Sequence, residues 1–171
     1  LLPCLFPNQY YSVNMHGKPE IYCGMITTVL LPLFYMNKEI KWNKKVGYSF
    51  LVAVLFFSMY IKPADMMWHG GQTPNWLPYR YSFLMSFVLV SMAVMTFSKL
   101  EGLKLTIGKI AGVFIGILAL VMYFDAKMPS FNYVKKGNIV YVDTVMTFVF
   151  GMILAGIYLV GLFFISKNMK K

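Results

Sequence analysis

The chain has 171 residues, of which 58% are hydrophobic and only 13% are charged, and 16 Lys and Arg against 6 Asp and Glu give a net charge of +10. A water-soluble core of this length could not bury so much apolar surface, and nucleic-acid-binding proteins carry their basic residues on polar surfaces rather than between long apolar runs. The composition therefore excludes a soluble enzyme, a disordered tail, a disulfide-stapled secreted domain and a nucleic-acid partner, and it indicates an integral protein of the lipid bilayer.

Five apolar segments follow one another along the chain. A helix that crosses the ~30 Å hydrocarbon layer needs about 20 mostly apolar residues. Pro32 lies inside the first segment, where a membrane helix tolerates it as a kink. The pattern predicts an all-α, polytopic bundle of about five transmembrane helices, with residues 1–20 as an outward-facing interfacial segment and 166–171 as a basic tail. The five predicted spans are 21–37, 46–61, 80–98, 108–124 and 145–165.

The connections between these spans alternate in charge. The loops at 38–45 and 99–109, together with the tail, have a net charge of +8, whereas the remaining segments have a net charge of only +2. Cytoplasmic loops of membrane proteins carry the excess of Lys and Arg. The sequence therefore predicts that the start of the chain lies outside the cell and its end in the cytoplasm.

Small residues recur on the fourth predicted span. Gly108, Gly112 and Gly116 form a GxxxGxxxG ridge, and such ridges let helix backbones approach closely in a membrane. We expect this ridge to pack against another helix of the same bundle, with dimerisation as the alternative.

The loop with the most chemistry is 62–83, KPADMMWHGGQTPNWLPYRYSF. Its Gly pair and X-Pro steps disfavour a helix and predict turns. Arg80 offers a planar fork that matches phosphate oxygens, with a snorkelling Arg in a belt of aromatic residues as the alternative. His69 is either a ligand-binding residue or a hydrogen-bonded structural one. Asp65 is a candidate general base or metal ligand, unless it is an ordinary solvated residue.

Three sequence runs carry a family resemblance: PNQYYSV, GKPEIYCG and, above all, HGGQTPNWLPYRYSF at 69–83. They resemble the YfhO family of bacterial membrane proteins, which is related to the GT-C glycosyltransferases, and the likeness spans about residues 1–100. Family members are several times longer, and Leu1 is not an initiator Met, so we expect this chain to be part of a longer protein. The resemblance implies that a sugar moves from a polyprenyl-phosphate donor to a cell-surface polymer, with lipoteichoic acid as the leading acceptor.

The resemblance also implies roles for single residues on the outer face of the bacterial cell membrane. Arg80 and His69 would neutralise the donor phosphate as it leaves, while Trp76 and Tyr79 would stack on the sugar or line the lipid entry. Asn75 belongs to the same matching run, and the catalytic acid of the GT-C pattern would lie before Leu1.

Two other functions stay open from the sequence, a non-catalytic membrane subunit and a lipid flippase or transporter. A translocation path needs polar residues inside the spans, and the interiors of the five spans hold no ionisable residue. The chain has no CxxC motif or Cys/His ligand cluster, so no cofactor is expected, and a divalent metal stays open.

Overall fold

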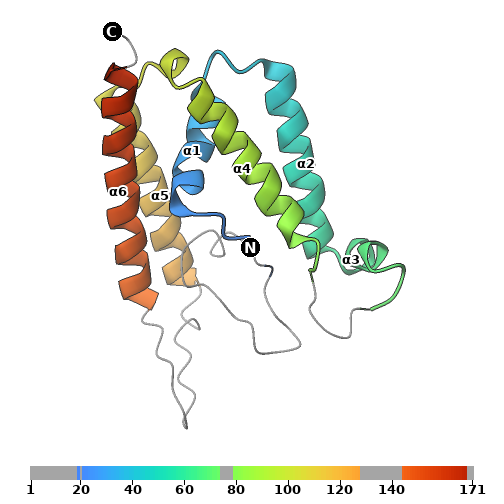
Figure 1. Ribbon diagram of the computed structural model, residues 1–171. Helices are drawn as coiled ribbons and strands as arrows, with labels where there is room; N and C mark the ends of the chain where they lie inside the picture. Colours follow the sequence, from blue (N-terminus) through green and yellow to red (C-terminus); the bar gives the residue numbers. More distant parts are fainter. Residues whose placement is uncertain (1–18, 20, 74–78, 128–143, 169–171) are drawn as a thin grey trace.

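A computed structural model describes residues 19, 21–73, 79–127 and 144–168, and within these ranges all regular structure is helical (Figure 1). This confirms the predicted all-α bundle. The helices are α1 (Met25–Met36), α2 (Trp42–Tyr60), α3 (Lys62–Trp68), α4 (Ser82–Ser98), the 3-10 helix η2 (Glu101–Leu103), α5 (Ile107–Lys127) and α6 (Thr144–Asn168).

A helix occupies each of the five segments that the sequence predicted, but several boundaries differ, and the first helix, α1, has only 12 residues. The first helix starts at Met25 because Gly24 before it has a φ of +92°, a left-handed conformation that ends regular helix. The helix α2 starts four residues earlier than predicted, so that Lys44 and Lys45 belong to its first turn rather than to a loop. At the other end of the chain, α6 continues to Asn168 into the predicted tail.

The main correction concerns the loop at 62–83, because its first seven residues form the helix α3. Pro63 occupies one of the first two helical positions, where the missing N–H of proline costs nothing. The chain bends by 105° between α2 and α3. The Gly pair acts as predicted: Gly70 and Gly71 have φ values of +66° and +80°, and the Gly71 N–H donates to the carbonyl of Met66 at 2.9 Å, which closes the end of α3.

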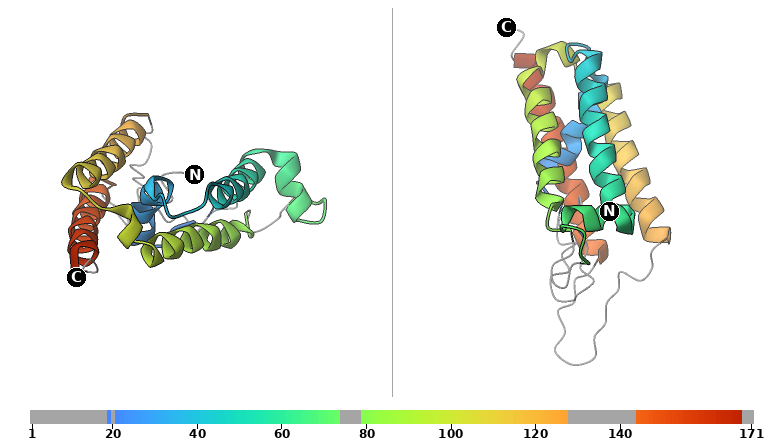
Figure 2. Two further views of the ribbon diagram at one scale, coloured as in Figure 1. Left: turned by 90° about the horizontal axis from the view of Figure 1, so that it is seen from above. Right: turned by 90° about the vertical axis from the view of Figure 1, so that its right-hand side faces the viewer.

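The short helix α1 is the centre of the bundle. It packs against α4 on one side and against α5 and α6 on the other; viewed from above, it lies between the α5–α6 pair and the α2–α4 pair (Figure 2). Val29, Leu33 and Phe34 are completely buried. Phe34 belongs to a core cluster with α2 and α4, whereas Val29 and Leu33 belong to a cluster with α5 and α6. The middle of α1 therefore packs into both core clusters and connects them.

The outer faces of the helices are apolar and uncovered. Phe87 of α4 is 70% exposed and Phe50 of α2 is 66% exposed. Large exposed apolar surfaces mark contact with another protein or with lipid. In the described part of the chain, one helix segment, Val149–Asn168, is long and apolar enough to cross a membrane alone, and the bent pair α2–α3 passes the same test as a second, broken candidate.

The glycine ridge on α5 does not pack as predicted. A Cβ atom added to Gly108, Gly112 or Gly116 would meet no atom within 4 Å, and all three residues are exposed. They line an open groove between α1 and α5 instead of a close helix contact. The spacing of the glycines places them on one face of the helix, but it does not show whether a neighbouring helix packs against that face.

The predicted cytoplasmic connections, α1–α2 and α4–α5, and the end of α6 lie at the same end of the bundle, which we call the basic end (Figure 1). Two of its lysines bind backbone carbonyls, one in the last turn of α1, where carbonyls lack helical partners, and one in the connection from α1 to α2. The Nζ of Lys45 donates to the carbonyl of Tyr35 at 2.7 Å, and the Nζ of Lys99 donates to the carbonyl of Glu39 at 3.0 Å. The basic residues thus tie helices together as well as carrying charge.

Candidate functional site

The candidate site is a group of four side chains at the end of the bundle opposite to the basic end, which we call the α3 cluster: Asp65, Trp68, His69 and Tyr81. The first three belong to α3 and its C-cap, and Tyr81 directly precedes α4. The bend between α2 and α3 brings α3 beside the start of α4 (Figure 1).

Asp65 is buried and hydrogen-bonded. Its side chain is only 11% exposed, and its Oδ1 accepts a hydrogen bond from the hydroxyl of Tyr81 at 2.9 Å. The bond joins residues that are 16 positions apart and connects α3 to the start of α4. The solvated-residue alternative for Asp65 is therefore wrong, and the carboxylate has a positioning contact that the sequence did not reveal.

His69 has one satisfied and one unsatisfied ring nitrogen. Its Nδ1 lies 2.9 Å from the backbone carbonyl of Asp65 and 3.8 Å from the Oδ1 of the same residue. Because a carbonyl oxygen only accepts, the hydrogen bond assigns a proton to Nδ1. The Nε2 atom is buried and has no hydrogen-bond partner among the described residues. A buried polar atom without a partner costs about 1–3 kcal/mol, and a ligand that bonds to Nε2 would remove this cost.

Tyr81 is the centre of the aromatic packing in the α3 cluster. The Trp68 ring stacks on it with a centroid distance of 4.9 Å and an interplanar angle of 16°, and the His69 ring approaches it edge-on at 6.0 Å. Tyr81 is 5% exposed, so it does not belong to an exposed aromatic belt. Stacking on one face and a hydrogen bond at the hydroxyl hold the ring in a single orientation.

Arg80 and Tyr79 lie on the turn that leads into Tyr81. Tyr79 is half-buried and has a φ of +65°, a left-handed conformation that costs a non-glycine residue about 1–2 kcal/mol; its carbonyl accepts from the Ser82 N–H at 2.8 Å. Arg80 is exposed. The strained turn therefore places exposed Arg80 directly before Tyr81 of the α3 cluster. The other two predicted binding residues, Asn75 and Trp76, lie outside the described residues.

The structure adds Trp68 and Tyr81 to the residues that the sequence singled out. Both were visible only as aromatic neighbours of His69 and Arg80, which is the signal that could have indicated them. Among the described residues, no three His, Cys, Asp or Glu side chains gather as a metal-binding group.

Comparison with known proteins places the chain in a family. The sequence model of the family described as "Bacterial membrane protein YfhO" matches residues 2–171. This match confirms the resemblance in residues 1–100 and extends it over the three C-terminal helices. No curated protein and no solved structure matches the chain.

Proposed function

Because the chain belongs to the YfhO family of bacterial membrane proteins, we propose that it is part of a membrane glycosyltransferase that moves a sugar from a polyprenyl-phosphate donor to a cell-surface polymer such as lipoteichoic acid. The run at 69–83 resembles the YfhO family, and the relation of that family to the GT-C glycosyltransferases supports this reaction class. The proposed setting is the bacterial cell membrane, crossed several times.

The observation that carries the proposal is that Nε2 of His69 has no hydrogen-bond partner within the described ranges, in a cluster whose Tyr81 directly follows Arg80 in the sequence. Sugar transfer from a phosphate donor leaves negative charge on the departing phosphate, and fixed cationic donors stabilise that charge. Arg80 can pair with two phosphate oxygens at once. A protonated His69 donates from both nitrogens: Nδ1 keeps its bond to the Asp65 carbonyl, and Nε2–H is left for the phosphate.

In this proposal Asp65 and Tyr81 are positioning residues. The Oδ1 of Asp65 lies 3.8 Å from Nδ1 of His69, within ion-pair distance of the ring when the ring is protonated. The Tyr81 hydroxyl holds that carboxylate from the opposite element. Trp76 and Tyr79 then stack on the sugar or line the lipid entry, as the family resemblance implies, and Asn75 belongs to the same binding loop.

The orientation follows from the two ends of the bundle. The connections with excess Lys lie at the basic end, and the α3 cluster lies at the other end (Figure 1). By the positive-inside rule the basic end faces the cytoplasm. The α3 cluster then faces outward, which is the side on which surface polymers are modified.

Two substitutions in the full-length protein test the proposal. Arg80→Ala removes the phosphate fork. His69→Asn removes Nε2 but retains a side-chain amide that can donate to the Asp65 carbonyl in place of Nδ1. We expect each to lower the sugar content of the surface polymer by at least about tenfold, the loss that follows from one charge-assisted hydrogen bond, at an unchanged level of membrane-inserted protein.

The matched control is Lys62→Ala, which removes another exposed cation from α3 and is expected to leave glycosylation unchanged. Normal glycosylation in both Arg80→Ala and His69→Asn would refute the phosphate site. Equal losses in all three variants would show that general surface charge, rather than the α3 cluster, is responsible.

A further inference from the structure

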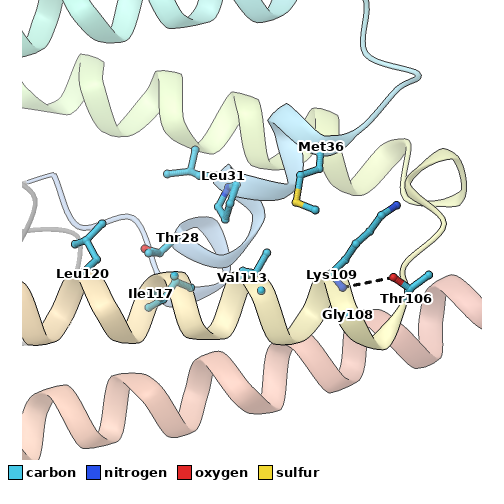
Figure 3. Close-up of a pocket in the computed structure, with 12 residues that line it drawn as sticks. Thr28, Leu31, Met36, Thr106, Gly108, Lys109, Val113, Ile117 and Leu120 are labelled. Carbon is cyan, nitrogen blue, oxygen red and sulfur yellow. Dashed lines mark hydrogen bonds between the residues drawn. The ribbon is translucent and has the colours of Figure 1, made fainter.

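A groove of about 660 Å³ lies between α1 and α5, on a different face from the α3 cluster. Gly108, Gly112 and Gly116 line its α5 side, where the missing side chains leave open space. Pro32 and Leu31 of α1 form part of the facing wall. In the close-up, Lys109 and Thr106 lie at one end of the groove and Leu120 lies at the other (Figure 3).

The length of the groove matches one leaflet of a bilayer. Lys109 and Leu120 are eleven positions apart on α5, and at 1.5 Å per residue they are separated by about 16 Å along the axis. Half of the ~30 Å hydrocarbon layer is about 15 Å. The groove starts at the basic end of the bundle, so it runs from the membrane surface on that side to about the middle of the bilayer.

The lining of the groove favours a hydrocarbon chain. Most of the lining residues are apolar, and the open space along the glycine face of α5 forms a trough beside α1. A flexible acyl chain is thinner than a helix, which is at least 10 Å in diameter, and it can follow such a trough.

The end of the groove at the membrane surface carries a fixed positive charge. The Nζ of Lys109 donates to the carbonyls of Leu103 at 2.6 Å and Lys104 at 3.1 Å. An ammonium group has three N–H donors, so one is left for a ligand. No carboxylate in the described ranges lies within ion-pair distance of Lys109. The charge is held in place by backbone carbonyls, and no side chain of the described residues neutralises it.

We propose that this groove holds one acyl chain of an anionic phospholipid from the leaflet at the basic end, with the phosphate bound by Lys109. The apolar trough accepts the chain and the fixed ammonium accepts the headgroup, an arrangement typical of basic pockets between membrane helices. The inference does not rest on the proposed function, because its residues are separate from the α3 cluster.

The test uses the full-length protein in detergent micelles, with bound lipid counted by native mass spectrometry. The probes are dioleoyl phosphatidylglycerol, which is anionic, and dioleoyl phosphatidylcholine, which has the same chains and no net charge. We expect the wild-type protein to retain phosphatidylglycerol preferentially. Glycerol phosphate, which has the anion but no acyl chain, should not compete.

Two variants distinguish binding of the acyl chain from binding of the headgroup. Gly112→Leu fills the trough and should weaken retention of phosphatidylglycerol by about tenfold, the effect of displacing roughly two buried methylenes. Gly161→Leu on α6 is the matched control, because its added side chain also enters open space. Lys109→Gln should abolish the preference for the anionic lipid while leaving phosphatidylcholine retention unchanged.

Four results would overturn the proposal: equal retention of the two lipids by the wild-type protein, equal retention of phosphatidylglycerol by Gly112→Leu and Gly161→Leu, an unchanged lipid preference in Lys109→Gln, or full competition by glycerol phosphate. A change from dimer to monomer in Gly112→Leu alone would assign the groove to a second copy of the chain. The first and last of the four results need no variant, so the proposal can fail even where a substitution impairs folding.

Discussion

A single buried amide joins the connection between α1 and α2 to the end of α4, and its replacement gives the sharpest test of the fold. Asn37, which follows α1, is 0% exposed. Its Nδ2 donates to the carbonyl of Lys99 at 2.7 Å, and its Oδ1 accepts from the N–H of Glu39 at 2.9 Å. A carbonyl only accepts and an N–H only donates, so the orientation of the amide is determined from both sides.

The substitution Asn37→Asp keeps the shape of the side chain and changes one atom. The oxygen that accepts from Glu39 remains, but the group facing the Lys99 carbonyl is no longer a donor. An unpaired buried carbonyl costs about 1–3 kcal/mol, and burying a carboxylate in place of a neutral amide adds to this cost. We expect the free energy of unfolding to fall by about 2–4 kcal/mol, which lowers the ratio of folded to unfolded protein by roughly 30- to 1,000-fold.

The assay is reversible unfolding of the full-length protein in mixed micelles, followed by tryptophan fluorescence as the fraction of denaturing detergent rises. Asn43→Asp is the control, because it makes the same chemical change at an exposed position in the first turn of α2. We expect the control to change the free energy of unfolding by less than about 0.5 kcal/mol. Equal effects of the two substitutions would refute the hydrogen bond between Asn37 and the end of α4.

Two further predictions concern the glycine backbone and the orientation in the membrane. Gly24→Ala should lower the free energy of unfolding by about 1–2 kcal/mol because Gly24 has a φ of +92°, whereas Gly47→Ala, inside α2, should raise it by up to about 1 kcal/mol. Both added methyl groups enter open space, so shifts of the melting temperature in the same direction would contradict the backbone explanation. For orientation, in a background without native cysteines, Thr73→Cys should react with an impermeant maleimide on intact cells and Lys104→Cys only after permeabilisation; the reverse pattern would invert the proposed topology.

The long helices were predictable because hydropathy is a property of consecutive residues. The segments at 80–98 and 145–165 lie within two or three residues of α4 and α6 at every boundary. The helix α3 was missed because the Gly and X-Pro signals of its loop lie after Trp68, and Pro63 is compatible with the first turn of a helix. The Gly and Pro residues therefore predicted the turn after Trp68 correctly, but they gave no information on the helix at 62–68.

The sequence predicts which residues belong to the candidate site, but it does not predict their contacts. Asp65, His69 and Arg80 stand out in the sequence by residue type and by the family run. The hydrogen bond from Tyr81 to Asp65 and the contact of the His69 ring with Tyr81 depend on the 105° bend that brings α3 to the start of α4. The angle of a bend between two helices depends on the packing around it. The spacing of apolar residues in the sequence does not predict that packing.

The sequence by itself determined an all-α membrane protein of the YfhO family, the positions of its long helices and the basic connections that lie at one end. These properties depend on composition and on neighbours within a few turns, where side chains repeat with a known period. Only the tertiary structure decided that α1 is central, that Asn37 reaches Lys99 across 62 positions, and that the glycine ridge of α5 lines a groove. Such contacts depend on how whole helices approach one another, and many pairings share the same hydropathy pattern.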